Sequence, residues 1–492
     1  MVKKTDKKRT KIVCTIGPAS SNEETLRQMI QAGMDVARIN FSHGDHDFHR
    51  RNIETIRRLA DEENAVVAVM GDLQGPKIRL GKIANEPVLL TEGQRLTLTT
   101  READGSGMVF PLPHPEFIKD VKPGNTILVD DGTLEFKVVS KQMDDLICEV
   151  VVGGDLLSRK GVSAPDARLT LSAITEKDRE DTRFALEMRL DYIAMSFVRS
   201  AKDIDALRYL CSFHGYEDVA IVAKIEKREA IEAFDEILAA TDAVMVARGD
   251  LGVETPAEEV PIQQKMIIRK CNAVGKPVIT ATQMLQSMIS NPRPTRAEAS
   301  DVANAIFDGT DAVMLSGETA SGKYPVVAVE TMAEIAEISE KHLDNSQARE
   351  NYKRTPMLTI KGYEGIADAT SHAASEIADG LNAKMIVTAT WTGYTARQAA
   401  RGRPNTAILC VTPKPEVYRR MALVWGVMPM LVAQFGTIDE MIGVIAKKAN
   451  DEGILDYGDL IVLLAGVPFG ASSSTNFLKV HKVGELGEVP EN

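Results

Sequence analysis

The chain has 492 residues, of which 44% are hydrophobic and 26% are charged, and its formal net charge is −12. The length predicts about three domains of ordinary globular composition, and the negative charge argues against a nucleic-acid-binding protein. A locally basic site for an anionic substrate is not excluded. No apolar run reaches the roughly 18 residues of a membrane helix, and no secretory signal is found. The five dispersed cysteines predict reduced thiols, so we expect a cytoplasmic protein.

Eight short apolar segments, most of them ending in Gly, Asp, Ser or Thr, recur along the chain. They are 11–16, 36–41, 66–72, 192–198, 219–226, 243–250, 277–282 and 312–318. Most gaps between them read as amphipathic helices, for example 23–32 and 262–274. Segments that are apolar throughout and alternate with helices are typical of parallel strands buried on both faces. Eight such units predict an α/β fold, a (β/α)8 TIM barrel made of residues 1–72 and 173–340.

The long gap after the third segment has a different character. Residues 80–172 are rich in Gly, Pro and Asp and alternate Val, Leu and Thr, as in 95–100 and 134–139. This pattern predicts an inserted all-β lid domain over residues 73–172, itself a small β-barrel. The insertion leaves the barrel at the face where barrel enzymes have their active sites, so it is well placed to close over a substrate.

A third block begins after about residue 340. The polar run 345–354 predicts a linker. Beyond it, predicted strands at 385–390, 407–411, 430–433 and 460–465 alternate with helices. We therefore expect a separate C-terminal α/β domain over residues 341–492.

Polar side chains follow six of the eight predicted barrel strands. They are Arg38, Asn40, Ser42, Asp72, Lys224, Glu226, Asp250, Thr282, Ser316 and Glu318. Turn residues at strand ends are often polar, but a lysine and carboxylates within β-rich runs favour a functional site. Glu226 and Asp250 suit Mg²⁺ or Mn²⁺, whereas Arg38 and Lys224 suit phosphate. The residues alone predict a Mg²⁺-dependent barrel enzyme that acts on a phosphorylated or carboxylated anion.

Two other patterns are interpreted as coincidental. Residues 317–323 match GxxxxGK, but Tyr324 stands where a P-loop has the Ser or Thr that binds Mg²⁺. His43, His46 and His49 lack the usual spacing of a zinc site, and His with Asp is common at the start of a helix.

Seven motifs follow one another along the chain: 37–44 (ARINFSHG), 71–79 (GDLQGPKIR), 223–226 (AKIE), 244–254 (VMVARGDLGVE), 281–288 (ATQMLQSM), 293–298 (RPTRAE) and 314–319 (MLSGET). Together they resemble the signatures of the pyruvate kinase family. The resemblance runs in order over nearly the whole chain, from residue 11 to about 483. It implies a glycolytic enzyme that transfers the phosphoryl group of phosphoenolpyruvate to ADP, giving pyruvate and ATP.

The same resemblance implies roles for the strand-end residues. Glu226 and Asp250 would bind the Mg²⁺ that contacts the carboxylate and enol oxygen of phosphoenolpyruvate. Lys224 would neutralise charge on the phosphoryl group in transfer, and Arg38 would bind the phosphate.

The resemblance also implies that residues at the next two strand ends bind the substrate carboxylate and deliver the proton of the reaction. The backbone N–H groups of Gly249 and Asp250, with Thr282, would bind the substrate carboxylate. Thr282 would also lie where the enolate carbon is protonated, through water. Ser316 and Glu318 either belong to that proton path or have a packing role, and both readings stay open.

Three further residues would face the nucleotide, ADP or ATP, which brings a second Mg²⁺. They are His43, Arg79 and Lys177.

One departure from the family motif concerns K⁺. In K⁺-dependent members a monovalent cation lies among oxygens that match Asn40, Ser42, Asp72 and the backbone carbonyl of Leu73. Those members have Thr at the position of Leu73 and Glu at the position of Lys77. The ammonium of Lys77 reverses the charge there and can take the place of the ion. The alternative is that Lys77 merely points to solvent, where a single charge often matters little. We nevertheless expect that K⁺ is not required.

The C-terminal domain carries a predicted effector site. Residues 387–396 read as a strand, a hydroxyl-rich turn and the start of a helix, which suits an anion, although an ordinary N-capped helix is the alternative. The expected contacts are Thr390, Thr392, Gly393, Tyr394 and Thr395. In the family this loop resembles the sugar-phosphate effector site. Because loop 466–470 lacks the Arg of fructose-1,6-bisphosphate-responsive members, we expect a phosphorylated sugar or AMP, acting in a homotetramer.

Two rival functions remain. One is a Mg²⁺-dependent barrel lyase that acts on pyruvate enolates, which the Asn40, Ser42 and Asp72 cluster and the inserted lid disfavour. The other is a nucleotide or sugar-phosphate sensor without catalysis, which is disfavoured by intact Lys224, Glu226, Asp250 and Thr282.

Overall fold

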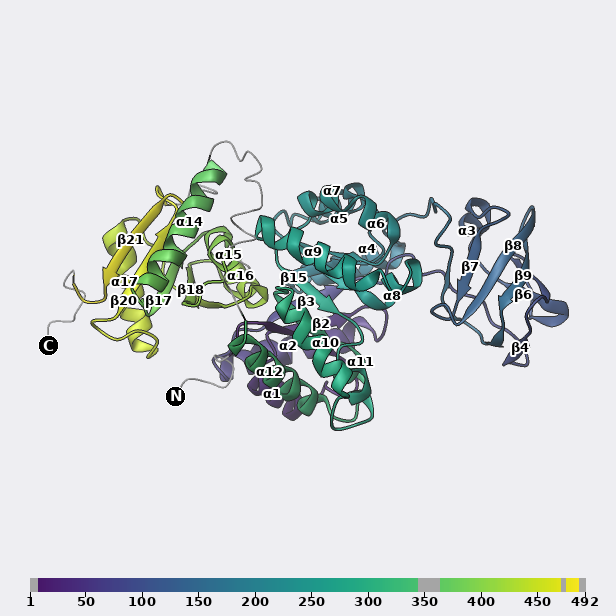
Figure 1. Ribbon diagram of the computed structural model, residues 1–492, viewed down its shortest axis with the longest axis horizontal. Helices are drawn as coiled ribbons and strands as arrows, with labels where there is room; N and C mark the ends of the chain where they lie inside the picture. Colours follow the sequence, from purple (N-terminus) through teal and green to yellow (C-terminus); the bar gives the residue numbers. More distant parts are fainter. Residues whose placement is uncertain (1–7, 344–362, 470–474, 486–492) are drawn as a thin grey trace.

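The computed structural model describes residues 8–343, 363–469 and 475–485. Three bodies lie along its long axis, with a barrel in the middle, a β-rich insertion at one end and an α/β domain at the other (Figure 1). Within the described ranges, no helix combines the length and the apolar character needed to cross a bilayer. The predicted linker at 345–354 lies outside these ranges.

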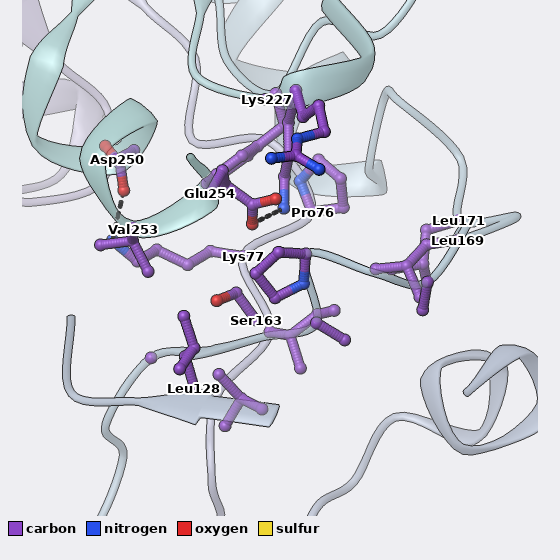
Figure 2. A pocket seen from close by; sticks show the side chains of 18 of the residues that line it. Pro76, Lys77, Leu128, Ser163, Leu169, Leu171, Lys227, Asp250, Val253 and Glu254 are labelled. Carbon is purple, nitrogen blue, oxygen red and sulfur yellow. Dashed lines mark hydrogen bonds and ion pairs between the residues drawn. The ribbon is translucent and has the colours of Figure 1, made fainter. Parts of the chain in front are cut away.

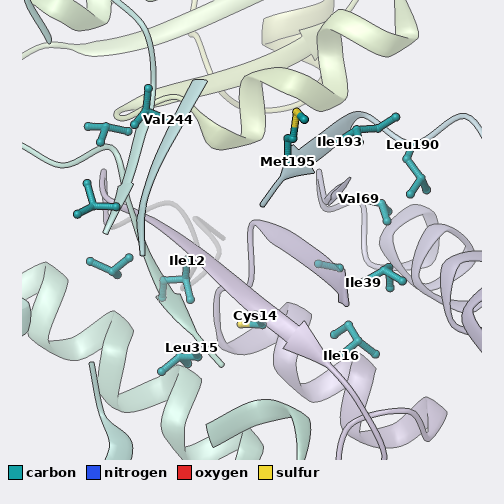
Figure 3. Close-up of a cluster of buried hydrophobic side chains, with 14 of the residues drawn as sticks. Ile12, Cys14, Ile16, Ile39, Val69, Leu190, Ile193, Met195, Val244 and Leu315 are labelled. Carbon is teal, nitrogen blue, oxygen red and sulfur yellow. The ribbon is translucent and has the colours of Figure 1, made fainter. Parts of the chain in front are cut away.

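Eight parallel strands close into the predicted barrel, in the order β1-β16-β15-β14-β13-β12-β3-β2. Their bounds are β1 (Lys11–Ile16), β2 (Val36–Asn40), β3 (Ala68–Asp72), β12 (Tyr192–Met195), β13 (Ala220–Ile225), β14 (Ala243–Ala247), β15 (Val278–Ala281) and β16 (Ala312–Leu315). Alternate side chains such as Ile12, Cys14 and Val69 point outward and join a large buried cluster with the surrounding helices (Figure 3). The other face fills the interior, so both faces are buried, as the uniformly apolar segments predicted.

Helices cover the barrel between the strands. They are α1 (Glu23–Ala32), α2 (His46–Glu62), α4 (Glu176–Glu187), α5 (Ala201–Phe213), α6 (Arg228–Glu232), α7 (Phe234–Ala240), α8 (Arg248–Glu254), α9 (Val260–Val274), α10 (Arg296–Phe307), α11 (Gly317–Ala320) and α12 (Pro325–Lys341), with a 3₁₀ turn at Gln286–Ile289. Side chains of Asn22, Asp45, Thr175 and Thr295 accept the first free N–H groups of α1, α2, α4 and α10. The predicted helix at 23–32 is confirmed, and the one at 262–274 begins two residues earlier with Pro261 in its first turn.

Three predicted strands were three residues too long at their carboxyl ends, and the first of them, β12, ends at Met195 and not at Val198. β14 ends at Ala247, so Asp250 lies in the first turn of α8, and β16 ends at Leu315, so Glu318 lies in α11. The cause is tertiary, because the N–H of Gly249 donates to the side-chain hydroxyl of Thr282 and not to a neighbouring strand. Apolar periodicity alone could not reveal where each strand reaches the rim.

The insertion between β3 and α4, which we call the lid, has its own core with Phe110, Phe117 and Phe136 fully buried. Its strands are β4 (Val88–Leu90), β5 (Arg95–Thr99), β6 (Val109–Pro111), β7 (Thr126–Val129), β8 (Leu134–Gln142), β9 (Asp145–Val152), β10 (Gly154–Leu156) and β11 (Val162–Ser163), with one helix, α3 (Pro115–Asp120), and a 3₁₀ turn at Ser106–Met108. The strand pairing differs from the expected small barrel. Six strands form one sheet, β11-β7-β8-β9-β5-β6, and β10 pairs only with β4. Gly153 separates β9 from β10, and Gly154, the first residue of β10, has a φ of +151°.

The C-terminal domain is the predicted α/β unit. Its sheet has the order β19-β18-β17-β20-β21. The strands are β17 (Met385–Ala389), β18 (Ala407–Thr412), β19 (Val427–Leu431), β20 (Leu460–Ala465) and β21 (Phe477–Lys482), and the helices are α14 (Tyr363–Gly380), α15 (Tyr394–Arg401), α16 (Pro415–Arg420) and α17 (Ile438–Asp451), with a 3₁₀ turn at Met421–Leu423. The expected strand at 430–433 begins three residues earlier. The antiparallel edge strand β21 was not predicted, because its alternating polar residues lack the apolar run of a buried strand.

The C-terminal domain closes the amino-terminal end of the barrel. The 3₁₀ turn inserts Ala422 and Leu423 into the interior cluster of the barrel. Around these two residues, which we call the plug, the Tyr192 hydroxyl donates to the Arg420 carbonyl at 2.8 Å, and Arg419 Nε donates to Asp191 at 2.8 Å. The carboxyl ends of the strands therefore form the barrel end that faces the lid.

This plug predicts a stability effect. Leu423 is fully buried among barrel side chains, so Leu423→Ala should lower the free energy of unfolding by about 3 kcal/mol through lost burial and the cavity left behind. The midpoint of urea denaturation measures it. Leu381, which is 50% exposed, is the matched control, and Leu381→Ala should cost less than about 0.5 kcal/mol. Equal effects of the two substitutions would contradict the packing of the plug.

Candidate active site

Two cations and two carboxylates meet at the carboxyl ends of β2, β3 and β13. Arg38 Nε lies 2.6 Å from Asp72 Oδ2, and Lys224 Nζ lies 3.1 Å from Asp72 Oδ1. Lys224 Nζ also lies 3.0 Å from Glu226 Oε1. Asp72 and Glu226 are each 1% exposed. Four strand-end residues of the sequence prediction thus form one buried ionic cluster.

The cluster shifts the protonation equilibria of its members. Burial by itself raises the pKa of Asp72, but the charges of Lys224 and Arg38 outweigh it, so the pKa of Asp72 lies below the usual value. Burial likewise disfavours the charged form of Lys224, yet Asp72 and Glu226 outweigh it and raise the pKa of the ammonium. Lys224 is therefore a permanent cation at neutral pH.

Glu226 behaves differently from Asp72. Burial raises the pKa of Glu226, Lys224 opposes the rise, and the negative charge of Asp250 adds to it. A cation placed between Glu226 and Asp250 would relieve this repulsion.

The turn after β12 supplies contacts that the sequence prediction missed. The Ser196 hydroxyl lies 2.6 Å from Lys224 Nζ, and the backbone N–H of Phe197 donates to Glu226 Oε2 at 2.7 Å. Phe197 has a φ of +54°, a left-handed conformation that costs about 1–3 kcal/mol for a bulky residue and persists only where its surroundings enforce it. The rule that found the other residues, a polar side chain at the carboxyl end of a barrel strand, would also have found Ser196.

Asp250, Gly249 and Thr282 form the other side of the site. The N–H of Gly249 donates to Thr282 Oγ1 at 2.8 Å, and this hydroxyl donates to the Ala281 carbonyl at 2.6 Å. Thr282 has a φ of +68°, which is rare for a β-branched residue. Arg248 Nη2 donates to the Thr282 carbonyl at 2.8 Å and so stabilises this conformation.

The donor set can be tested for its fit to a divalent cation. In the described parts of the chain, no three His, Cys, Asp or Glu side chains gather as a metal site. Glu226 and Asp250 are close enough to influence each other's charge and supply hard oxygen ligands. Mg²⁺ is commonly bound by one or two carboxylates plus water and substrate oxygens. The residues fit such an ion.

Ser316 and Glu318 have structural contacts. Both carboxylate oxygens of Glu318 accept backbone N–H groups, from Leu285 at 3.1 Å and from Ser316 at 2.7 Å. Glu318 is 1% exposed. These bonds join the segments after β15 and β16, which favours the packing role over the proton path.

Lys77 lies in the cleft between lid and barrel. Figure 2 shows its side chain extending toward Asp250, and the two are joined by an ion pair of 3.8 Å. Lys227 and Glu254 pair beside it on the barrel side, while Leu128 and Ser163 line the cleft from the lid. About a third of each side chain of the Lys77–Asp250 pair is exposed, so solvent weakens the attraction.

Three of the four oxygens expected around a monovalent cation, those of Asn40, Asp72 and Leu73, already have protein partners. The Asn40 amide oxygen accepts the N–H of Ser42, and the Leu73 carbonyl accepts the Ser196 hydroxyl at 2.7 Å. Asp72 is paired with two cations. Within the described ranges, Lys77 makes its side-chain ion pair with Asp250 and not with these oxygens.

The expected nucleotide residues come from both bodies. Lys177, in the first turn of α4, donates to the Phe41 carbonyl at 2.9 Å and pairs with Asp181. His43 is exposed after β2, and its carbonyl accepts from the ring of His49. Arg79 lies on the lid, where its guanidinium donates to the Arg159 carbonyl. His43 and Lys177 thus belong to the barrel and Arg79 to the lid, and among the described residues these side-chain bonds do not join the three to one another.

The expected effector residues form a tight turn between β17 and α15. The Thr390 hydroxyl accepts the N–H of Gly393 at 3.0 Å, and the Thr392 hydroxyl accepts the N–H of Tyr394 at 3.4 Å. Thr395 is buried and bonds the hydroxyl of Thr475. The N-cap residue of α15 is Gly393, with a φ of +79°, and no side chain caps this helix, so the hydroxyl contacts belong to the turn and the alternative of an ordinary N-capped helix does not hold.

Comparison with known proteins agrees with this arrangement. A family model described as "Pyruvate kinase, barrel domain" matches residues 7–329, and one described as "Pyruvate kinase, alpha/beta domain" matches residues 368–481. A pyruvate kinase of Geobacillus stearothermophilus is 48% identical over 98% of this chain and 81% of its own length. One of Clostridium perfringens is 46% identical over 96% of this chain and 100% of its own.

A solved structure is similar over the same extent. The crystal structure of a pyruvate kinase from Cryptosporidium parvum superposes with a TM-score of 0.91 at 37% identity, over 98% of both chains. Matching family models, sequence relatives and structure all cover the barrel and the C-terminal domain. The chain is therefore a phosphotransferase that belongs to the pyruvate kinase family.

Proposed function

We propose that the chain transfers the phosphoryl group of phosphoenolpyruvate to ADP, with the residues of the ionic cluster in the roles that the family motif implies. The observation that carries these roles is the convergence of the basic side chains of Lys224 and Arg38 with the carboxylates of Glu226 and Asp250 at one barrel end. Phosphoryl transfer needs positioning and charge neutralisation more than covalent chemistry, and this site offers both.

Different residues bind different parts of the substrate. Arg38 binds the phosphate, and Lys224 stabilises negative charge on the phosphoryl group as it moves. The N–H groups at residues 249 and 250, with Thr282, receive the carboxylate, for which the N–H of Gly249 exchanges its present bond to Thr282 Oγ1. His43, Arg79 and Lys177 orient the nucleotide across the mouth of the cleft.

A divalent cation completes this site. Glu226 and Asp250 would hold Mg²⁺ or Mn²⁺, which supplies Lewis-acid stabilisation of the charge that develops on the enol oxygen. Thr282, whose hydroxyl is oriented by the Ala281 carbonyl, lies beside this site and positions the water that delivers the proton to the enolate carbon. A second Mg²⁺ accompanies the nucleotide.

The decisive assay follows pyruvate formation with Mg²⁺ and phosphoenolpyruvate, with and without ADP. Pyruvate should form only with ADP, and ATP should appear in equal amount. Pyruvate formed without ADP would favour the lyase, and no turnover at all would favour a sensor. Asp250→Asn should fold but lose most of its turnover, by about 10²-fold or more, because it removes charge from the transition-state site.

A matched control for Asp250→Asn lies in the same cleft. Asp131 is a lid carboxylate with a φ of +53°, a conformation that Asn tolerates. Asp131→Asn should retain near-normal turnover. Normal activity of Asp250→Asn at ordinary Mg²⁺ concentration would refute the metal assignment.

We also propose that the enzyme does not need K⁺. Lys77 puts a positive charge in the cleft, where it pairs with Asp250. If its side chain turned to the pocket, repulsion between two cations about 4 Å apart would cost about 4 kcal/mol at an effective dielectric of about 20. Arg38 and Lys224 already neutralise Asp72, one of the oxygens that would hold the ion. Asn40, Ser42 and the Leu73 carbonyl are the remaining members of that pocket.

The K⁺ prediction is tested by steady-state assay with a bulky organic cation in place of Na⁺ and K⁺. Activity should change little when K⁺ is added, whereas Lys77→Glu should create a K⁺ requirement. Lys82→Glu, the same charge reversal at an exposed lid position, should not. Wild-type activity that K⁺ raises by more than about tenfold, or 1.4 kcal/mol, would refute the prediction.

Regulation is proposed for the turn at Thr390, Thr392, Gly393, Tyr394 and Thr395. Its hydroxyl and N–H groups suit one phosphate, so a sugar monophosphate or AMP should activate the enzyme, which we propose acts as a cytoplasmic homotetramer. Thr390→Val should abolish activation and leave basal turnover intact. The control is Thr370→Val on α14, where the hydroxyl bonds only within its helix. Activation by fructose-1,6-bisphosphate alone would contradict the proposal.

A further inference from the structure

We infer that residues 196–199, which we call the 196–199 turn, couple the position of the lid to the geometry of Lys224 and Glu226, and that Arg199 is a positioning residue for the reaction. This inference deepens the proposed function and rests on it for the roles of those two side chains. The turn itself lies outside the residues that the sequence motifs single out.

The chain that enters the lid contacts this turn. The Leu73 carbonyl accepts the Ser196 hydroxyl at 2.7 Å. Two residues on, Gly75 has a φ of +68°, and a Cβ there would lie 2.9 Å from the Phe197 ring and 3.0 Å from the Ser196 Cβ. The close approach leaves no room for any side chain at Gly75, so the entering segment packs directly against the turn.

The chain that leaves the lid is bound by the other end of the same turn. Arg199 donates from Nη2 to the Leu171 carbonyl at 2.6 Å and from Nη1 to the Leu169 carbonyl at 2.5 Å. The side chains of Leu169 and Leu171 pack against the core of the lid. Arg199 thus connects the barrel to a segment whose side chains belong to the lid.

The turn also touches the catalytic cluster. The Ser196 hydroxyl that bonds the Leu73 carbonyl also accepts from Lys224 at 2.6 Å. The strained Phe197 donates its N–H to Glu226, and the ammonium of Lys227 lies 5.7 Å from the Phe197 ring centre. The 196–199 turn therefore contacts the segments that enter and leave the lid, and it also contacts Lys224 and Glu226.

A movement of the lid would change the positions of Lys224 and Glu226 together. A shift of Leu73 or of the 169–171 segment displaces the hydroxyl that orients Lys224 and the N–H that orients Glu226. Lid closure would then complete the metal and phosphoryl contacts only when the substrate is enclosed, which limits loss of the enolate to water.

The test uses Arg199→Met in the full chain, which removes both carbonyl bonds. Groups that orient metal ligands typically contribute about 10- to 100-fold to metal affinity or activity, so Mn²⁺ affinity, measured by electron paramagnetic resonance without substrate, should fall by about tenfold. Turnover should fall by a similar factor, with a smaller change in KM for ADP. Proteolytic cleavage within residues 164–172 should become faster. Arg199→Lys, which keeps the charge and one donor, should restore part of the Mn²⁺ affinity.

The control is Arg208→Met on α5. Arg208 makes comparable bonds, to the Ala240 carbonyl at 3.0 Å and to Asp242 at 2.9 Å, but touches neither connection of the lid. It should change neither Mn²⁺ affinity nor turnover. Faster proteolysis of Arg199→Met with unchanged Mn²⁺ affinity and turnover would overturn the inference, since Arg199 would then only anchor the chain.

Two further outcomes are decisive. If Arg199→Met does not fold, unchanged Mn²⁺ affinity of Arg199→Lys overturns the coupling, and a fall supports it. Because Mn²⁺ binding is measured without substrate, a chain that shows the predicted affinities but forms no pyruvate would refute the proposed activity and support the coupling.

Discussion

The ion pairs of Lys224 with Asp72 and Glu226 are the constraint on which the rest of the site depends. A charge at this depth costs several kcal/mol unless it is paired and hydrogen-bonded. Each carboxylate therefore has a second partner, Arg38 for Asp72 and the N–H of Phe197 for Glu226. These paired charges hold one another in place, because removing any one of them would leave its partner as an unpaired buried charge.

The two ends of the barrel are filled by different kinds of side chain. At the amino-terminal end, the C-terminal domain fills the interior with Ala422 and Leu423 and covers Asp191 with Arg419. At the carboxyl end, charge takes the place of apolar packing and the lid lies above it. The plugged amino-terminal end resists deformation. A movement of the lid therefore changes the carboxyl end of the barrel, where Ser196 and Phe197 contact Lys224 and Glu226.

Backbone strain in the site has a consistent pattern. Phe197 and Thr282 both take left-handed conformations, and each is held by a charged group, Glu226 in one case and Arg248 in the other. In Phe197 the strained backbone directs its N–H to the Glu226 carboxylate, and in Thr282 it places the hydroxyl between the Gly249 N–H and the Ala281 carbonyl. Packing and ion pairs elsewhere in the barrel offset its cost.

The sequence by itself determined the eight barrel strands, the inserted lid, the C-terminal α/β domain and most members of the charged cluster. Those features depend on local apolar periodicity and on residue type at strand ends, both of which a single chain displays. Tertiary structure alone decided where β14 and β16 end, that Lys77 pairs with Asp250, and that Glu318 binds backbone N–H groups. It also decided the role of residues 196–199, because their partners lie far away in sequence, at positions 73, 169–171 and 224–226, and no local pattern records which distant segments a turn will touch.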